Sequence, residues 1–296
     1  MTPHPTVLTV IVSYNFCKWI DKCLNSLQNS DFQTDVMVVD NHSSDATVQT
    51  IRQRYPWVKL LPQDSNLGFG RANDIGMQYA IDHHYDYVFL LNEDAWIDKE
   101  TLGTLVNASA SNPDYGIVSP VHLTGSGKNI EKGFSDYTSV HSIDELQGIS
   151  TQLVEAPFIN AAIWLMPVEI IKRVGMFAPL FYHYGEDKDL VNRMHYHGYK
   201  VGFSPRVMGY HDREFRKSTR SSRLRGERVY HLSEYANVNY PASKAFAMGV
   251  LAPVKKSLSA LCHGHLRDTA SYLSMSLNLL HNTPAVLKTR KQSAKS

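Results

Sequence analysis

The sequence has few cysteines, little net charge and no long uninterrupted apolar run. Its three cysteines, Cys17, Cys23 and Cys262, are too few for a disulfide framework and lack the spacing of a zinc site, which fits a reducing compartment. A net charge of +2 gives no reason to expect a nucleic-acid partner. The apolar segment Val7 to Val12 lacks the basic leader and cleavage site of a secretory signal, and no run reaches the roughly 18 apolar residues of a spanning helix. These absences predict a cytoplasmic chain.

What the sequence does contain is a regular alternation of strand and helix patterns over its first 120 residues. Apolar runs such as VLTVIVSYN and YVFLLNED are typical of buried strands, and stretches with helical spacing, such as residues 70–83, separate them. This alternation predicts an α/β fold with a mostly parallel central sheet flanked by helices. From residue 124 to 152 the pattern loosens, which predicts irregular structure or a short hairpin.

Polar residues follow three of the predicted strands directly. They are Tyr14 and Asn15, Asp40 and Asn41, and Asn92, Glu93 and Asp94. Ligands of open α/β sheets bind beyond the carboxyl ends of the strands, so these clusters predict one shared binding site. The carboxylates in FLLNEDAWI would be costly to bury unpaired, and we therefore expect them to face water, a cation or a substrate.

The known phosphate-binding fingerprints do not fit these clusters. The chain has no Walker-type lysine loop, and GFGRANDIG supplies only a degenerate glycine pattern, so a hydride-transferring enzyme is a weak alternative. Asp40 could accept the imide N–H of a uracil or thymine ring that Tyr14 borders, or it could simply cap a turn. Asp94 could hold a divalent cation, Mn²⁺ or Mg²⁺, against a diphosphate.

Six segments resemble the motifs of the family 2 glycosyltransferases, in the order and spacing of that family. They are VIVSYN, VVDNHSSDAT, NLGFGRAND, LLNEDAWI, the stretch from Val174 to Val201, and Tyr210-His211, and together they cover about residues 6–215. The chain is thus similar to inverting enzymes with the GT-A fold and, among them, to the rhamnosyltransferase-like branch. The resemblance implies metal-dependent transfer from a UDP- or dTDP-sugar, dTDP-rhamnose being one candidate, to a saccharide or lipid-linked saccharide in cell-surface polysaccharide synthesis. The alternatives are another donor (UDP-galactose, UDP-glucose or a UDP-N-acetylhexosamine) or a catalytically silent sugar-nucleotide-binding scaffold.

The same resemblance implies roles for particular residues. Asp40 would contact the pyrimidine base, and Asp94 and His211 would hold the cation, although His211 could also be purely structural. Asn92 departs from the acidic pair often found in the metal motif, so we expect weaker cation binding. The remaining contacts to the nucleotide sugar would come from Tyr14, Asn15, Asn41, Ser43, Asn66, Gly68, Phe69, Arg71, Asn73, Asn92 and Glu93.

A second acidic cluster, YGEDKDL, offers the general base with which an inverting transfer removes the proton of the acceptor hydroxyl. Glu186, Asp187 and Asp189 crowd the first turn of a predicted helix, where the helix dipole favours negative charge, and capping is the alternative role. Resemblance to a Glu-Asp pair of the family points to Asp187 as the base, with Glu186 as its neighbour or an acceptor contact. Arg193 is the expected partner of Asp189.

Three regions are expected along the chain. They are a GT-A catalytic domain over residues 1–215 (nucleotide-sugar half about 1–120, acceptor half about 121–215), a basic and helical extension over 216–287, and a basic, disordered tail over 288–296. The stretch HDREFRKSTRSSRLRGER is interpreted either as a flexible lid over phosphates or as a solvated basic face. The segments PVKKSLSALCHGHL and SYLSMSLNLLH predict either peripheral contact with the inner face of the plasma membrane or ordinary packing helices.

Overall fold

The computed structural model describes residues 4–213 and 219–295. The described chain divides into two compact units, the first made of residues 4–176 and 198–213, the second of residues 177–197 and 219–295. The division differs from the expected domain boundary at residue 215. Residues 177–197 lie inside the predicted catalytic domain, but they pack with the C-terminal helices and therefore form part of the second unit.

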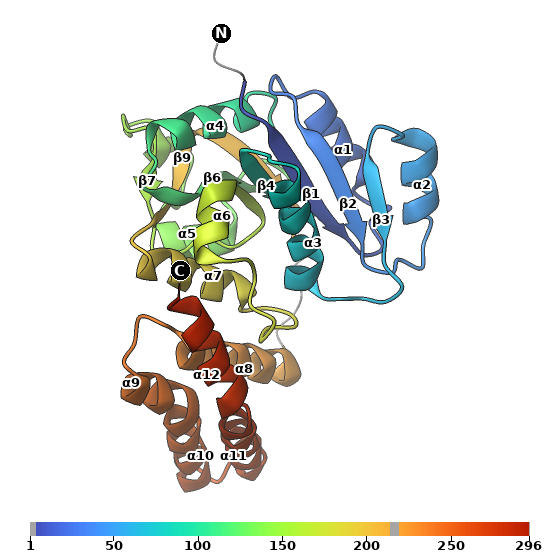
Figure 1. The fold of residues 1–296 in the computed structure, drawn as a ribbon. Helices are drawn as coiled ribbons and strands as arrows, with labels where there is room; N and C mark the ends of the chain where they lie inside the picture. Colours follow the sequence, from blue (N-terminus) through green and yellow to red (C-terminus); the bar gives the residue numbers. More distant parts are fainter. Residues whose placement is uncertain (1–3, 214–218, 296) are drawn as a thin grey trace. The chain divides into compact units, whose positions relative to one another are not determined.

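A nine-stranded mixed sheet forms the centre of the first unit (Figure 1). The strand order is β3-β2-β1-β4-β8-β6-β9-β5, and β7 pairs with β9. The parallel pairings β1–β2, β1–β4, β2–β3 and β6–β9 contain most of the paired residues, which confirms the mostly parallel α/β sheet. The strands are β1 (Val7–Ser13), β2 (Asp35–Asp40), β3 (Lys59–Pro62), β4 (Tyr87–Leu91), β5 (Ala95–Ile97), β6 (Tyr115–Thr124), β7 (Val154–Glu155), β8 (Ile163–Pro167) and β9 (Lys200–His211).

Helices cover both faces of the strands that carry the predicted site (Figure 1). Alternate residues of a strand point to opposite faces, and Ile11, Val38 and Phe89 pack in one core with α1 (Ile20–Gln28), α2 (Thr47–Arg54) and α4 (Thr101–Ser111). On the other face, α3 (Phe69–Asp82) lies so close to β1 that a β-carbon on Gly76 would come within 2.5 Å of the Val10 side chain. Burial on both faces explains why these strands are apolar throughout.

Short elements of the first unit were not anticipated from the sequence. β5 has only three residues and pairs antiparallel with β9. Part of the segment 124–152, expected to be irregular or a hairpin, forms α5 (Lys132–Thr138), which begins where the Glu131 side chain accepts a hydrogen bond from the Phe134 N–H at 3.0 Å. A 3₁₀ turn (Asp144–Leu146) follows α5, and α6 (Val168–Val174) follows β8. Elements this short carry too little periodicity to be recognised.

The second unit is helical. Its elements are α7 (Glu186–Tyr196), α8 (Arg220–Ala236), α9 (Ala242–Phe246), a π-helical turn (Ala247–Leu251), α10 (Ala252–Cys262), α11 (Leu266–His281) and α12 (Thr283–Ser293). The tail over residues 288–296, expected to be disordered, is helical up to Ser293. The Arg290 guanidinium donates to the backbone oxygens of Asn237 and Tyr240, and these long-range bonds hold the tail in place.

The basic stretch expected as a lid or a solvated face is largely helix. Arg216 and Lys217 lie outside the described residues, and from Arg220 onward the stretch belongs to α8. Thr219 begins this helix with a capping box, and Arg220 forms an ion pair with Asp268 of α11 at 2.7 Å. Over residues 220–228, a helix with these fixed contacts does not match the flexible lid.

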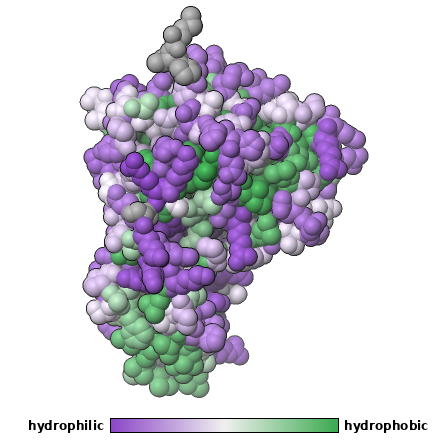
Figure 2. Space-filling model, viewed as in Figure 1, coloured by the Kyte–Doolittle hydropathy of each residue, from purple (hydrophilic) through white to green (hydrophobic). Residues whose placement is uncertain are grey.

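One helix of the described residues, the continuous run Ala242–Cys262, is long and apolar enough to cross a membrane by length and composition. Serines and lysines interrupt the apolar residues there, so this helix contains no uninterrupted apolar run of spanning length. Only 28% of its most apolar window is buried. Figure 2 shows the hydrophobic surface of the second unit gathered over the end formed by α10 and α11.

Candidate active site

Asp40 lies at the carboxyl end of β2, directly opposite Ser13 at the end of β1. It is almost fully buried, and three hydrogen bonds hold its carboxylate. The Ser13 hydroxyl donates to Oδ1 at 2.9 Å, the Ser43 N–H donates to Oδ2 at 2.9 Å, and the Ser43 hydroxyl also donates to Oδ1. A carboxylate has about four acceptor sites, so one remains for the N–H of a ligand. Ser13, which the sequence reasoning did not select, is therefore a positioning residue.

Tyr14 and Asn15 follow β1, and the two residues have different roles at this edge of the sheet. Asn15 adopts a left-handed backbone conformation with φ 59°, and its side-chain oxygen accepts the Ser44 N–H at 2.9 Å. Asn15 thereby shapes the loop after β2. The Tyr14 ring is half exposed, while its backbone N–H donates to Glu93 Oε2 at 2.7 Å. Tyr14 thus presents an aromatic face beside the end of β1.

Asn41 ties the end of β2 to the start of α3. Its side chain accepts the Leu67 N–H at 3.0 Å and donates to the Gly68 oxygen at 3.2 Å. Gly68 begins α3 with φ 83°, a conformation that a side chain would strain, and Asn66 accepts the Gly68 N–H at 2.9 Å. These residues shape the rim of the site with their backbones.

Three predicted contact residues lie within α3 itself. Asn73 is buried and donates to the Phe69 oxygen at 3.0 Å, so its amide serves the helix. Arg71 is exposed and borders a cavity of about 480 Å³ that is lined by other α3 residues. The structure thus gives Asn73 an internal role and places Arg71 on the outside of α3.

Asn92, Glu93 and Asp94 form the turn from β4 to β5, with the Ala95 N–H donating to the Asn92 oxygen at 3.0 Å. The register that pairs Ala95 with His211 brings Asp94 to β9. His211 Nε2 lies 3.3 Å from Asp94 Oδ1, and the Asp212 N–H donates to the Asp94 oxygen at 2.8 Å. Burial raises the pKa of Asp94, but the hydrogen bond and charge of His211 outweigh it, and the net pKa is lowered.

Glu93 behaves differently from its neighbour. Burial, opposed by the Tyr14 N–H and reinforced by the charges of Asp94 and Asp40, raises the pKa of Glu93 to about 8. Glu93 therefore carries its proton over much of the neutral range, while Asp94 stays ionised. One negative charge stands at the end of the turn.

The donor atoms of Asp94 and His211 suit a divalent cation. Carboxylate oxygen is the preferred ligand of Mg²⁺ and Mn²⁺, and imidazole nitrogen is a further ligand for transition metals. His211 is buried, and its Nδ1 has no hydrogen-bond partner among the described residues. Within residues 4–213 and 219–295 no group of three or more His, Cys, Asp or Glu side chains could hold a metal. The pair therefore fits a cation whose remaining ligands come from a bound diphosphate.

The predicted base lies on α7 in the second unit. Gly185 precedes this helix with φ 92°, and a β-carbon there would come within 2.9 Å of Ser233 Oγ on α8. Glu186 is buried, its Oε2 finds no partner among the described residues, and burial with the nearby Asp187 charge raises its pKa to about 7. Asp187 is only partly buried, and its Oδ1 accepts the Lys188 N–H at 2.8 Å. Asp187 is thus the more accessible acid of the two.

Asp189 has a structural role in the same helix. Its carboxylate accepts a hydrogen bond from Arg193 Nε at 2.9 Å, and both side chains are buried. The predicted Asp189–Arg193 ion pair is confirmed, so the third acid of the first turn is engaged within the helix. Tyr14, Asp40, Glu93, Asp94 and His211 thus share one unit, whereas Glu186 and Asp187 belong to the other.

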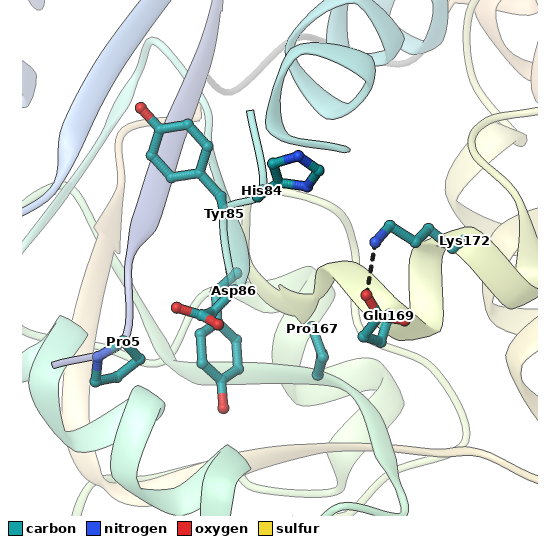
Figure 3. A pocket seen from close by; sticks show the side chains of 8 residues that line it. Pro5, His84, Tyr85, Asp86, Pro167, Glu169 and Lys172 are labelled. Carbon is teal, nitrogen blue, oxygen red and sulfur yellow. Dashed lines mark hydrogen bonds and ion pairs between the residues drawn. The ribbon is translucent and has the colours of Figure 1, made fainter. Parts of the chain in front are cut away.

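A cavity of about 390 Å³ lies at the amino ends of β1 and β4 (Figure 3). Asp86 and Tyr87 line it together with Pro5, and Lys172 donates to Glu169 across one side at 2.6 Å. The predicted site lies at the opposite, carboxyl ends of the same strands. Because ligands of such sheets bind at the carboxyl ends, this cavity is not the donor site.

Comparison with solved structures identifies the fold. The first 349 residues of S. aureus TarS, in complex with UDP-GlcNAc, superpose with a TM-score of 0.60 at 14% identity, covering 98% of this chain and 91% of that one. The mannosyltransferase PcManGT from Pyrobaculum calidifontis, in complex with GDP-Man and Mn²⁺, gives a TM-score of 0.55 at 20% identity, covering 96% and 76%. The mixed sheet with its helical C-terminal region is that of the GT-A glycosyltransferases.

Sequence comparison then gives the family. The sequence model described as "Glycosyl transferase family 2" matches residues 9–175, and the chain belongs to this family. A curated relative, the N-acetylglucosaminyl-diphospho-decaprenol L-rhamnosyltransferase of Mycobacterium tuberculosis, is 27% identical over 222 residues, which cover 62% of this chain and 69% of the relative. The chain is therefore a glycosyltransferase that uses nucleotide-sugar donors, and the enzyme class expected from the motifs is confirmed.

Proposed function

We propose that the protein is a metal-dependent inverting glycosyltransferase that moves a sugar from a UDP- or dTDP-sugar to a saccharide or lipid-linked saccharide acceptor in cell-surface polysaccharide synthesis. The observation that supports a UDP- or dTDP-sugar as donor is the hydrogen bonding of Asp40. Its carboxylate is oriented by Ser13 and Ser43 and keeps one acceptor site, which suits the imide N–H shared by uracil and thymine. The ring of Tyr14 would border the base.

Asp94 and His211 would hold the divalent cation beside the diphosphate. The cation would neutralise charge that develops on the leaving nucleoside diphosphate. The Asp212 N–H donates to the backbone oxygen of Asp94, and the 3.3 Å between Asp94 Oδ1 and His211 Nε2 places the two candidate ligand atoms side by side. The neighbour that binds Mn²⁺ with its nucleotide sugar supports this assignment.

Asp187 would accept the proton of the acceptor hydroxyl as that oxygen attacks the anomeric carbon and the diphosphate leaves from the opposite face. Its partial exposure leaves it open to an acceptor, whereas Glu186 is buried and Asp189 is held by Arg193. A carboxylate within hydrogen-bond reach of the hydroxyl is sufficient for this step. One displacement of this kind inverts the anomeric configuration.

Two relatives support different donors within the same class. The mycobacterial relative is named a rhamnosyltransferase with a lipid-diphosphate-linked acceptor, and TarS is bound to UDP-GlcNAc. We therefore place dTDP-rhamnose first and a UDP-N-acetylhexosamine second. The name of the mycobacterial relative also supports a lipid-linked saccharide as the acceptor.

The decisive experiment incubates the protein with a panel of UDP-, dTDP- and GDP-sugars and records nucleoside diphosphate release with and without saccharide acceptors. Release is expected with UDP- or dTDP-sugars and to fall to background in Asp94→Asn. Asp136→Asn, which changes an exposed first-unit acid paired with Lys132, is the matched control and should retain activity. A preference for GDP-sugars would contradict the assignment of Asp40, and no release with any donor would contradict the proposed activity.

A further inference from the structure

The helical hairpin of α10 and α11 exposes an unusual amount of leucine. Seven leucines on and beside these helices are each 46–68% exposed, and we call them the leucine face: Leu251, Leu258, Leu261, Leu266, Leu273, Leu277 and Leu280. Within each helix they follow the three- and four-residue spacing that places side chains on one side. Single exposed leucines are ordinary, but a contiguous apolar surface marks an interaction site (Figure 2).

The interior of the same hairpin contains two buried serines beside the apolar Val250, Met275 and Leu279. The buried Ser257 hydroxyl donates to the Thr269 oxygen at 2.8 Å, and the buried Ser276 hydroxyl donates to the Val250 oxygen at 2.8 Å. These two bonds also show that α10 and α11 run antiparallel. Apart from the buried Leu279, the leucines of α10 and α11 face outward, and small hydroxyl residues take part in the helix contact. This arrangement is favourable next to lipid, where no hydrophobic force draws leucines inward.

The charge of the second unit favours an anionic partner. From Thr219 to Lys295 the chain carries twelve lysines and arginines against three acids. Each of these three acids forms an ion pair within the unit: Glu227 with Lys256, Glu234 with Lys188, and Asp268 with Arg220. The excess is positive, and its exposed members include Lys255, Arg267, Lys288, Lys291 and Lys295.

We propose that the leucine face inserts into the headgroup and upper acyl region of an anionic lipid bilayer and holds the enzyme on the membrane surface. Leucines enter the apolar layer, and the neighbouring lysines and arginines reach lipid phosphates. The hairpin lies along the surface and does not span, because α11 returns after a turn of three residues and Lys255, Lys256 and Arg267 would be costly at the bilayer centre. This attachment is independent of the donor and of the transfer reaction.

The test is sedimentation of the full chain with vesicles of phosphatidylcholine containing phosphatidylglycerol, against vesicles of phosphatidylcholine alone, without donor or acceptor. The wild type should sediment with the anionic vesicles, and added salt should weaken binding. Leu258→Asn with Leu277→Asn, two of the most exposed leucines, should lower the partition coefficient by about tenfold or more while the thermal unfolding temperature stays unchanged. Lys255→Gln should lower it by roughly fivefold, the loss of one lysine near the surface.

The matched control is Trp57→Asn in the first unit, which removes a larger exposed apolar side chain and should leave vesicle binding unchanged. Wild-type protein that stays in solution with anionic vesicles at low salt overturns the proposal. So does equal binding by the leucine double variant. If sedimentation velocity shows a dimer that the leucine variant separates, without vesicle binding, a second copy of the chain covers the face. Because nucleoside diphosphate release is measured separately, failure here leaves the proposed transfer reaction standing.

Discussion

The acids at the strand ends of the first unit and the acids that begin α7 in the second unit are held by different parts of the backbone. Asp40 and Asp94 are placed by β-ladder register, opposite Ser13 and beside His211. Glu186 and Asp187 are placed by a helix start that depends on the left-handed Gly185. The ladder fixes the strand-end acids among donors from several segments, while the helix start buries Glu186 and leaves Asp187 partly exposed.

This difference separates acids suited to binding from acids suited to proton transfer. Three hydrogen bonds orient the carboxylate of Asp40, and the pKa of Asp94 is lowered on balance by His211 despite burial. On α7, burial raises the pKa of Glu186 to about 7, and Asp187 is partly exposed. From this comparison we expect Asp40 and Asp94 to bind the donor and the partly exposed Asp187 to accept the proton.

Removal of divalent cations tests the binding side of the comparison with the largest expected effect. Chelation with EDTA should reduce nucleoside diphosphate release to background, because Asp94 and His211 supply only two ligands and the diphosphate would lose its neutralising charge. Excess Mn²⁺ or Mg²⁺ should restore release, measured by a coupled nucleotide assay. Full activity in EDTA would mean that basic side chains alone neutralise the leaving group.

Asp187→Asn tests the proton-transfer side. The substitution removes basicity and nearly preserves shape, so transfer should fall by about 10²–10⁴-fold while the donor binds unchanged. The transfer rate of Glu186→Gln should fall less, because Glu186 is buried beside the proposed base. Rates come from product formation, donor affinity from calorimetry, and the anomeric configuration from NMR of the product. A retained anomer, or near-normal transfer by Asp187→Asn, contradicts the assignment.

Asp40→Ala should weaken donor binding by about 1.5–3 kcal/mol, roughly 10- to 150-fold, because a bond to a charged acceptor is lost. Asp40→Asn keeps the shape and serves as the second variant if alanine disturbs the buried Ser13. Ser13→Ala should have a smaller effect of about 0.5–1.5 kcal/mol, since it only loosens the carboxylate. Calorimetry with UDP and dTDP measures both. Unchanged affinity in a folded Asp40 variant would remove Asp40 from the base site.

The sequence predicted the strand-end clusters well because apolar runs mark where buried strands stop, and Asp40 and Asp94 follow such runs directly. It missed Ser13 and Asp212 because their roles depend on register between strands, which the local pattern does not carry. The order of the tail depends on bonds from Arg290 to carbonyls about 50 residues away, so its composition alone suggested disorder. Local periodicity thus predicts the helices and strands, whereas the contacts of their side chains depend on pairing between distant segments.

The smallest expected effect concerns stability against pH, where Glu186 of α7 and Glu145 of the first unit should differ in sign. Burial raises the pKa of Glu186 to about 7 from an ordinary value of about 4.5, so the folded state holds this proton more tightly than the unfolded state. Its contribution to stability is present below about pH 4.5 and is lost as the pH rises through about 7. Glu186→Gln does not titrate, so the wild type should lose on the order of 1 kcal/mol relative to this variant across that window.

Glu145 of the first unit supplies a control of opposite sign. The His141 N–H donates to its carboxylate at 2.9 Å and lowers the pKa of Glu145, so its contribution is present above its ordinary pKa and is lost as the pH falls. Denaturant unfolding of the wild type, Glu186→Gln and Glu145→Gln at about pH 4, 5.5 and 7.5 measures all three. The free energy of unfolding of Glu186→Gln should increase relative to wild type as the pH rises. That of Glu145→Gln should increase relative to wild type as the pH falls. A free-energy difference between wild type and Glu186→Gln that stays constant from pH 4 to 7.5 would show that Glu186 ionises normally in the folded protein.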